Sequence, residues 1–76
     1  MKLNLSSLVR TNEGFPTEWS CNTLEGKQIK ISYRYGRTKI LVEGKVVDSL
    51  SIDQFDIGGY MEDDALQKLL KINGYI

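Results

Sequence analysis

Three short turns, each centred on a glycine, divide the first two-thirds of this 76-residue chain into segments of similar length. The turns occupy residues 24–27 (LEGK), 35–38 (YGRT) and 42–45 (VEGK). The residues between them are rich in isoleucine, valine, tyrosine and threonine, which favour strands. Such short segments leave room for hairpins but not for crossover helices. The sequence therefore predicts an antiparallel meander with strands near 17–23, 27–35, 38–43 and 45–51.

The C-terminal part of the chain changes from a strand pattern to a helical one. Apolar residues recur at three- and four-residue spacings in MEDDALQKLLKINGYI, which indicates an amphipathic helix near 62–73 with Gly74 as its C-terminal cap. The stretch 51–60 before it is expected to form a short helical turn and a glycine hinge. We expect an α+β fold, with a three- or four-stranded antiparallel β-meander packed on one C-terminal α-helix, in a single domain over residues 1–76.

Side-chain alternation along the strands assigns the large apolar residues to one face of the sheet. With Gly36-Arg37 as a two-residue turn, Tyr33 pairs with Ile40. The helix is expected to lie on this face, which also holds Trp19.

The opposite face carries the basic residues. Residues 27–45 include six basic side chains and one acid, whereas residues 46–64 include six acids and no base. We expect acids to balance much of this positive charge across the strands, for example Asp48 opposite Lys39. The two arginines of the basic block are left without an acidic partner.

Two aliphatic residues, Leu41 and Val46, pair on this same polar face. We expect the N-terminal segment 1–15 to fold across and cover them. Otherwise they would form a contact surface for another chain. A further alternative is that the alternating Leu3 and Leu5 add a strand to the sheet.

The composition does not indicate catalysis. The chain has no histidine, the commonest zinc ligand and the commonest general base near neutral pH. Cys21 is the only cysteine, so no intrachain disulfide forms, and it falls on the expected core face. The acids Asp53 and Asp56 before Gly58 miss the calcium-loop spacing, and no P-loop follows the glycines. We expect no enzymatic activity, no catalytic residues, no metal and no cofactor.

The sequence also lacks membrane signals. No apolar run approaches the roughly 18–20 residues that cross a bilayer. The first residues show no signal-peptide pattern. We expect a cytoplasmic protein without a membrane partner.

Single-stranded nucleic-acid binding is the alternative function. Aromatic rings on a sheet can stack bases while basic neighbours hold phosphates. The required residue types are present at Tyr33, Arg34, Tyr35, Arg37 and Lys39. Alternation, however, places Tyr33 and Tyr35 on the face opposite Arg34, and the net charge is zero. Nucleic acid is therefore the less favoured partner.

The favoured interpretation is a small non-enzymatic protein-binding module, that is, an inhibitor, an adaptor or a subunit. Its partner would be another protein, with a homodimer as the other arrangement, bound to the outer face of the sheet. The residues expected to bind the partner are Arg34, Arg37, Lys39, Leu41 and Val46. A second candidate surface is acidic and consists of Asp56, Glu62, Asp63 and Asp64.

Overall fold

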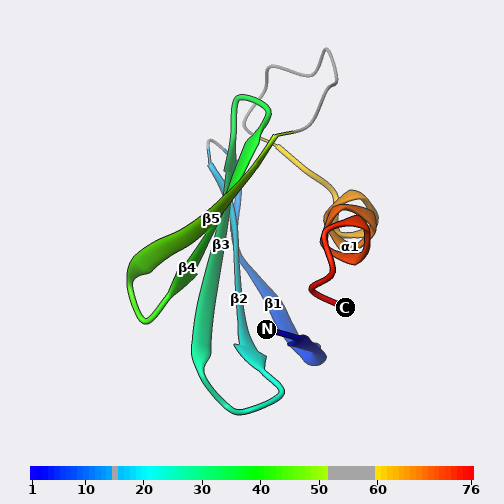
Figure 1. Ribbon diagram of the computed structural model, residues 1–76. Helices are drawn as coiled ribbons and strands as arrows, with labels where there is room; N and C mark the ends of the chain where they lie inside the picture. Colours follow the sequence, from blue (N-terminus) through cyan, green and yellow to red (C-terminus); the bar gives the residue numbers. More distant parts are fainter. Residues whose placement is uncertain (15, 52–59) are drawn as a thin grey trace.

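The computed structural model describes residues 1–14, 16–51 and 60–76. Over these residues the chain forms a five-stranded antiparallel sheet, in the order β1-β2-β3-β4-β5, and one C-terminal helix (Figure 1). The predicted α+β class is confirmed, but the sheet has five strands rather than three or four. The turn and hinge expected within 51–60 fall almost entirely outside the described residues. The elements are β1 (Leu3–Glu13), β2 (Thr17–Thr23), β3 (Gln28–Arg34), β4 (Arg37–Val42), β5 (Lys45–Ser51) and α1 (Asp63–Ile72).

The additional strand is β1, so the prediction that segment 1–15 covers the outer aliphatic pair is wrong. β1 pairs with β2, at the edge of the sheet opposite β5. Pairing with β2 satisfies the backbone hydrogen bonds of β1, while Leu3 at its start enters the core. The alternating leucines therefore add a strand, which was the other alternative that the sequence offered.

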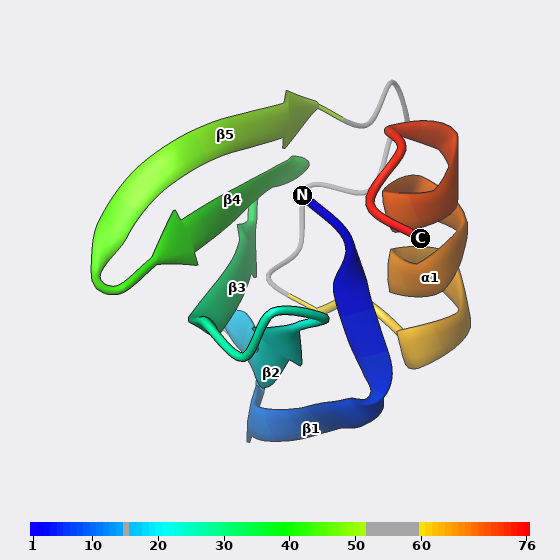
Figure 2. The same ribbon diagram turned by 60° about the horizontal axis from the view of Figure 1, so that its bottom comes forward.

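β1 bends partway along its length. Its pairing with β2 passes from Asn4–Asn22 directly to Val9–Ser20, so the residues between Asn4 and Val9 bulge out of the ladder. The Asn4 side-chain oxygen stabilises this bulge by accepting hydrogen bonds from the Ser6 backbone N–H and hydroxyl groups, at 3.1 and 2.6 Å. Figure 2 shows the resulting curl of the sheet around α1.

The β3–β4 hairpin turns one residue earlier than the sequence predicts. Its central residues are Tyr35 and Gly36, and both have positive φ (51° and 77°), as a type I′ turn requires. The predicted Gly36-Arg37 turn is therefore wrong, and Tyr33 pairs with Thr38. The register moves by two residues, which changes every partner but keeps each side chain of the two strands on its predicted face.

The β4–β5 hairpin has a two-residue turn at 43–44 and a bulge farther along. The register shifts beyond the Leu41–Val46 pair, and Val47 is the extra residue. Asp48 consequently pairs with Ile40 and lies on the inner face, where the Tyr75 side chain contacts it. The bulge turns Asp48 to the inner face, so the charge pair predicted between Lys39 and Asp48 does not form. Strand alternation alone cannot anticipate a bulge.

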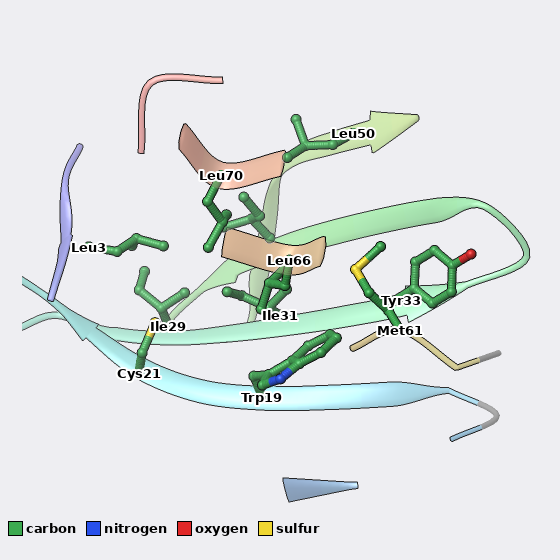
Figure 3. Close-up of a cluster of buried hydrophobic side chains, with 11 residues drawn as sticks. Leu3, Trp19, Cys21, Ile29, Ile31, Tyr33, Leu50, Met61, Leu66 and Leu70 are labelled. Atoms are coloured by element: carbon green, nitrogen blue, oxygen red, sulfur yellow. The ribbon is translucent and has the colours of Figure 1, made fainter. Parts of the chain in front are cut away.

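Helix α1 covers the inner face, as the apolar pattern predicts. Leu66 and Leu70 are fully buried there, against Trp19 and the isoleucines of β3 and β4 (Figure 3). Burial raises the pKa of the Cys21 thiol, which therefore stays protonated at neutral pH and acts as a small core residue. The buried cluster consists of Leu3, Trp19, Cys21, Ile29, Ile31, Tyr33, Ile40, Leu50, Met61, Leu66 and Leu70.

Arg10, Trp19 and Asp63, here called the helix clamp, fasten the start of α1 to the sheet. Asp63 Oδ1 accepts the Trp19 indole N–H at 2.9 Å and an Arg10 guanidinium N–H at 2.7 Å. The guanidinium also donates to the Met61 carbonyl oxygen at 2.9 Å and lies 5.4 Å from the Trp19 ring centre. Hydrogen bonds from Trp19 and from Arg10, together with the charge of Arg10, lower the pKa of the Asp63 carboxyl.

The C-terminal residues tie the helix to both edges of the sheet. Gly74 ends α1 with a φ of 82°, which confirms the predicted glycine cap. The Leu3 N–H donates to the Tyr75 carbonyl oxygen at 2.8 Å, and the Tyr75 hydroxyl donates to the Asp48 carboxylate. Burial, together with Asp48, raises the pKa of Tyr75 to about 12. Asp48 is thus used inside the fold and is not available to the outer face.

The helix clamp predicts that Asp63→Asn destabilises the protein at neutral pH. The expected loss in the free energy of unfolding is about 1 kcal/mol. This value is small for a charged acceptor because more than half of the Asp63 side chain is exposed to solvent. The folded-state pKa lies below the unfolded value of about 3.9, so this stability is present above that pH and is lost as the pH falls through the folded pKa. Urea unfolding followed by Trp19 fluorescence measures both effects. Asp64→Asn, the neighbouring exposed acid, is the matched control and should change stability little.

The buried threonines provide a second prediction. The Thr38 hydroxyl is fully buried and has no hydrogen-bond partner among the described residues, whereas the Thr17 hydroxyl accepts the Met61 N–H at 3.0 Å. Thr38→Val should therefore raise the free energy of unfolding by about 1 kcal/mol, because it removes a buried polar group without a partner. Thr17→Val should lower it by about 1–2 kcal/mol. Equal losses in both variants would contradict this account.

Candidate functional site

The face of the sheet away from α1, here called the outer face, is uncovered in the part of the chain that the structure describes (Figure 1). Three rows of side chains cross it from strand to strand. All five residues that the sequence assigns to partner binding belong to these rows. The rows are Arg34–Arg37, then Glu18–Ser32–Lys39–Ser49, then Ser20–Lys30–Leu41–Val46.

Arg34, Arg37 and Lys39, here called the basic cluster, gather at one end of the outer face. The two arginines are direct cross-strand partners, an arrangement that like-charge repulsion disfavours. No acid among residues 1–14, 16–51 and 60–76 forms an ion pair with any of the three, and Glu18 instead pairs with Lys30 at 3.1 Å. The predicted pair of Lys39 with Asp48 does not form, whereas Arg34 and Arg37 lack an acidic partner among the described residues, as the sequence predicts. The basic cluster therefore keeps its charge exposed.

Tyr35 adds an exposed aromatic ring to the basic cluster. Its side chain is 63% exposed, and the Arg34 guanidinium carbon lies 5.1 Å from the ring centre. Tyr35 escapes strand alternation because it lies in the turn, where its positive φ is unusual for a bulky residue and asparagine is preferred. A residue that fits its backbone poorly and buries little is a candidate for binding. Tyr33, in contrast, is buried on the inner face.

An open depression lies beside these cations. Its volume is about 450 Å³, and Pro16, Ser32 and Tyr35 line it together with the basic cluster. A second depression of about 350 Å³ lies farther along the face, beside Ser20 and Lys30. The first depression offers space for an anionic group of a partner next to three cations and a hydroxyl.

The other end of the outer face is aliphatic. Leu41 is half-buried and its cross-strand partner Val46 is 56% exposed. Val47, the extra residue of the bulge, follows Val46 in the chain and is 54% exposed. Strand alternation places Val47 on the inner face beside Ile40, and this prediction is wrong, because Val47 is the extra residue of the bulge and Asp48 pairs with Ile40 instead.

The second predicted surface is only partly available for binding. Asp56 lies outside the described residues. Asp63 is held in the helix clamp by Arg10. Glu62 and Asp64 are exposed at the start of α1, where acids also suit the helix dipole. These two acids alone make a weaker candidate than the outer face.

The described residues hold no group of three histidine, cysteine, aspartate or glutamate side chains placed to bind a metal ion. Within the same ranges, no helix has the length and apolar character needed to span a membrane. Comparisons of the chain with protein-family models, with curated proteins and with solved structures found no match. The case for a function therefore rests on the outer face.

The β3–β4 and β4–β5 turns provide two matched positions at which the backbone strain of Tyr35 can be tested. Glu43 has a φ of 50° before Gly44, as Tyr35 has before Gly36. Glu43→Asn should raise the free energy of unfolding by about 0.5–1 kcal/mol, because asparagine tolerates this conformation. Tyr35→Asn should stay within about 0.5 kcal/mol of the wild type, since the same gain is offset by the lost contact with Arg34.

Thermal and urea unfolding of both variants measure these differences. A large loss of stability in Tyr35→Asn would mean that the ring is needed for folding, and would remove the argument that it is kept for binding.

Proposed function

We propose that this protein is a non-enzymatic binding module that takes an acidic and partly apolar segment of another protein on its outer face. The basic cluster would hold carboxylates of the partner, and Leu41, Val46 and Val47 would contact its apolar side chains. Arginine suits this task because its planar fork can bind a carboxylate through two hydrogen bonds.

The observation that carries the proposal is the coincidence of unpaired charge and exposed apolar side chains on one face. No described acid forms an ion pair with the basic cluster, so nothing among the described residues neutralises the repulsion between Arg34 and Arg37. A bound anion would relieve this repulsion. Arginine, tyrosine and aliphatic residues in one patch are also the composition that the energetically important part of protein interfaces favours.

Single-stranded nucleic acid is a second candidate because of one observation. Tyr35 lies beside Arg34 with its ring exposed, so a base could stack on it while the basic cluster holds a phosphate. Among the described residues, Tyr35 offers the one aromatic ring available there, because Tyr33 is buried. Single-strand readers generally stack successive bases on several rings. The aliphatic end of the face would have no role in such a complex.

Selection from a random-peptide display library on the immobilised full-length chain tests the proposal. We expect the selected peptides to combine aspartate or glutamate with an apolar residue, and to bind more weakly as the salt concentration rises. The double variant Arg37→Ala, Lys39→Ala should weaken their binding about tenfold, as two exposed charge pairs would. A labelled single-stranded oligonucleotide should not bind under the same conditions.

Lys68→Ala is the matched control, because Lys68 is an exposed lysine on α1 that has no ion pair among the described residues. Selected peptides without acids, or peptides that bind the double variant and the wild type equally well, would refute the proposed surface. An oligonucleotide whose binding depends on Arg37 would favour the second candidate.

A further inference from the structure

We infer that the partner segment binds in an extended conformation, with acidic residues at two alternate positions and an apolar residue at the next alternate position. This inference rests on the proposed function and specifies the chemistry of the partner. It follows from the order of the outward side chains along β4, which are Arg37, Lys39 and Leu41 in sequence.

The spacing of these three side chains matches an extended chain. Residues two apart on a strand lie about 6.6–6.8 Å apart, since each residue rises by 3.3–3.4 Å. A second extended segment has the same repeat, so its alternate side chains meet Arg37, Lys39 and Leu41 in register. A segment with the pattern acid-x-acid-x-apolar, in either chain direction, therefore complements β4 at every position.

Cross-strand neighbours reinforce each of the three positions. Arg37 has Arg34 beside it, which gives the first acid two guanidinium groups. Lys39 has the Ser32 hydroxyl beside it, at the floor of the depression. Leu41 has Val46 beside it on β5, which makes the third position aliphatic on two strands, while its neighbour on β3 is Lys30, whose charge Glu18 already pairs. The face thus changes from doubly cationic to singly cationic to apolar along one strand.

A second copy of this chain does not offer the required pattern in its described residues. Of its described acids, only Glu62 and Asp64 lie two residues apart, and they adjoin the first turn of α1. Residues two apart on a helix point in different directions, so these two cannot meet Arg37 and Lys39 together. The occupant that fits is therefore a segment of a different protein.

Fluorescence anisotropy with three labelled peptides tests the inference on the full-length chain. The first peptide is Gly-Ser-Glu-Ser-Glu-Ser-Val-Ser-Gly, in which acids and valine alternate with serine. The second has the same composition with the three residues adjacent, Gly-Ser-Ser-Glu-Glu-Val-Ser-Ser-Gly. The third is an alanine-based helical peptide in which the first acid, the second acid and the valine follow one another at intervals of four residues. We expect the first peptide to bind about fivefold more tightly than either other peptide, the factor that one well-placed charge pair supports.

Protein variants assign each peptide position to its partner. Lys39→Ala should remove most of the preference for the alternating peptide, whereas Lys68→Ala should leave it unchanged. A version of the alternating peptide with serine in place of valine should bind the wild type more weakly than the original peptide. In Val46→Ser, this difference in affinity should disappear. Because Val46 and Lys39 are both exposed, neither variant should affect folding.

The outcomes separate this inference from the proposed function. If the alternating and adjacent peptides bind equally well and both depend on Arg37, the inference is wrong and the acidic-segment function stands. Tighter binding of the helical peptide also overturns the inference alone. If none of the peptides binds and a labelled oligothymidylate binds through Arg37, both the inference and the proposed function are wrong.

Discussion

The period-two alternation of side chains along the strands is the constraint on which the rest of this structure depends. It sends Trp19, Ile31 and Ile40 to the inner face, where α1 covers them. It sends the cations of β3 and β4 to the outer face, where no described segment covers them. The helix clamp and the C-terminal residues then hold α1 in place, so that the covered face and the open face stay distinct. The proposed binding surface is a consequence of this division.

Two features of the outer face make sense for binding but not for stability. Arg34 and Arg37 lie directly opposite each other, and Tyr35 occupies a left-handed turn position beside them. The like-charge pair and the left-handed backbone of Tyr35 both oppose folding, although the contact of the Tyr35 ring with Arg34 offsets the backbone strain. Each of them places a cation or a ring at the edge of the same depression. On the helix side, Asp48, Asp63 and Thr17 are hydrogen-bonded to neighbouring elements, and the Thr38 hydroxyl is the buried exception among the described residues.

The sequence predicts the two-sided sheet and the helix because both follow from periodicity, which tolerates small errors in register. The turn at Tyr35 and Gly36 was displaced by one residue, yet the register changed by two and every side chain of β3 and β4 kept its face. The cross-strand partners within this hairpin changed, however, and the bulge in β5 removed the predicted pair of Lys39 with Asp48. Periodicity does not predict the bulge at Val47 or the bend in β1, because each inserts residues that have no partner in the ladder. The alternation of side chains does not mark where such residues are inserted.

The central claim is that α1 occupies the inner face and leaves the basic face open. Hydroxyl-radical footprinting of the native protein, read by mass spectrometry, tests this claim most directly, because the aromatic residues are divided between the two faces. Tyr35 should be oxidised rapidly, whereas Trp19 and Tyr33 should be protected until the protein unfolds. Oxidation of Trp19 and Tyr33 at the rate of Tyr35 under native conditions would show that the helix does not cover the inner face, and would contradict the account.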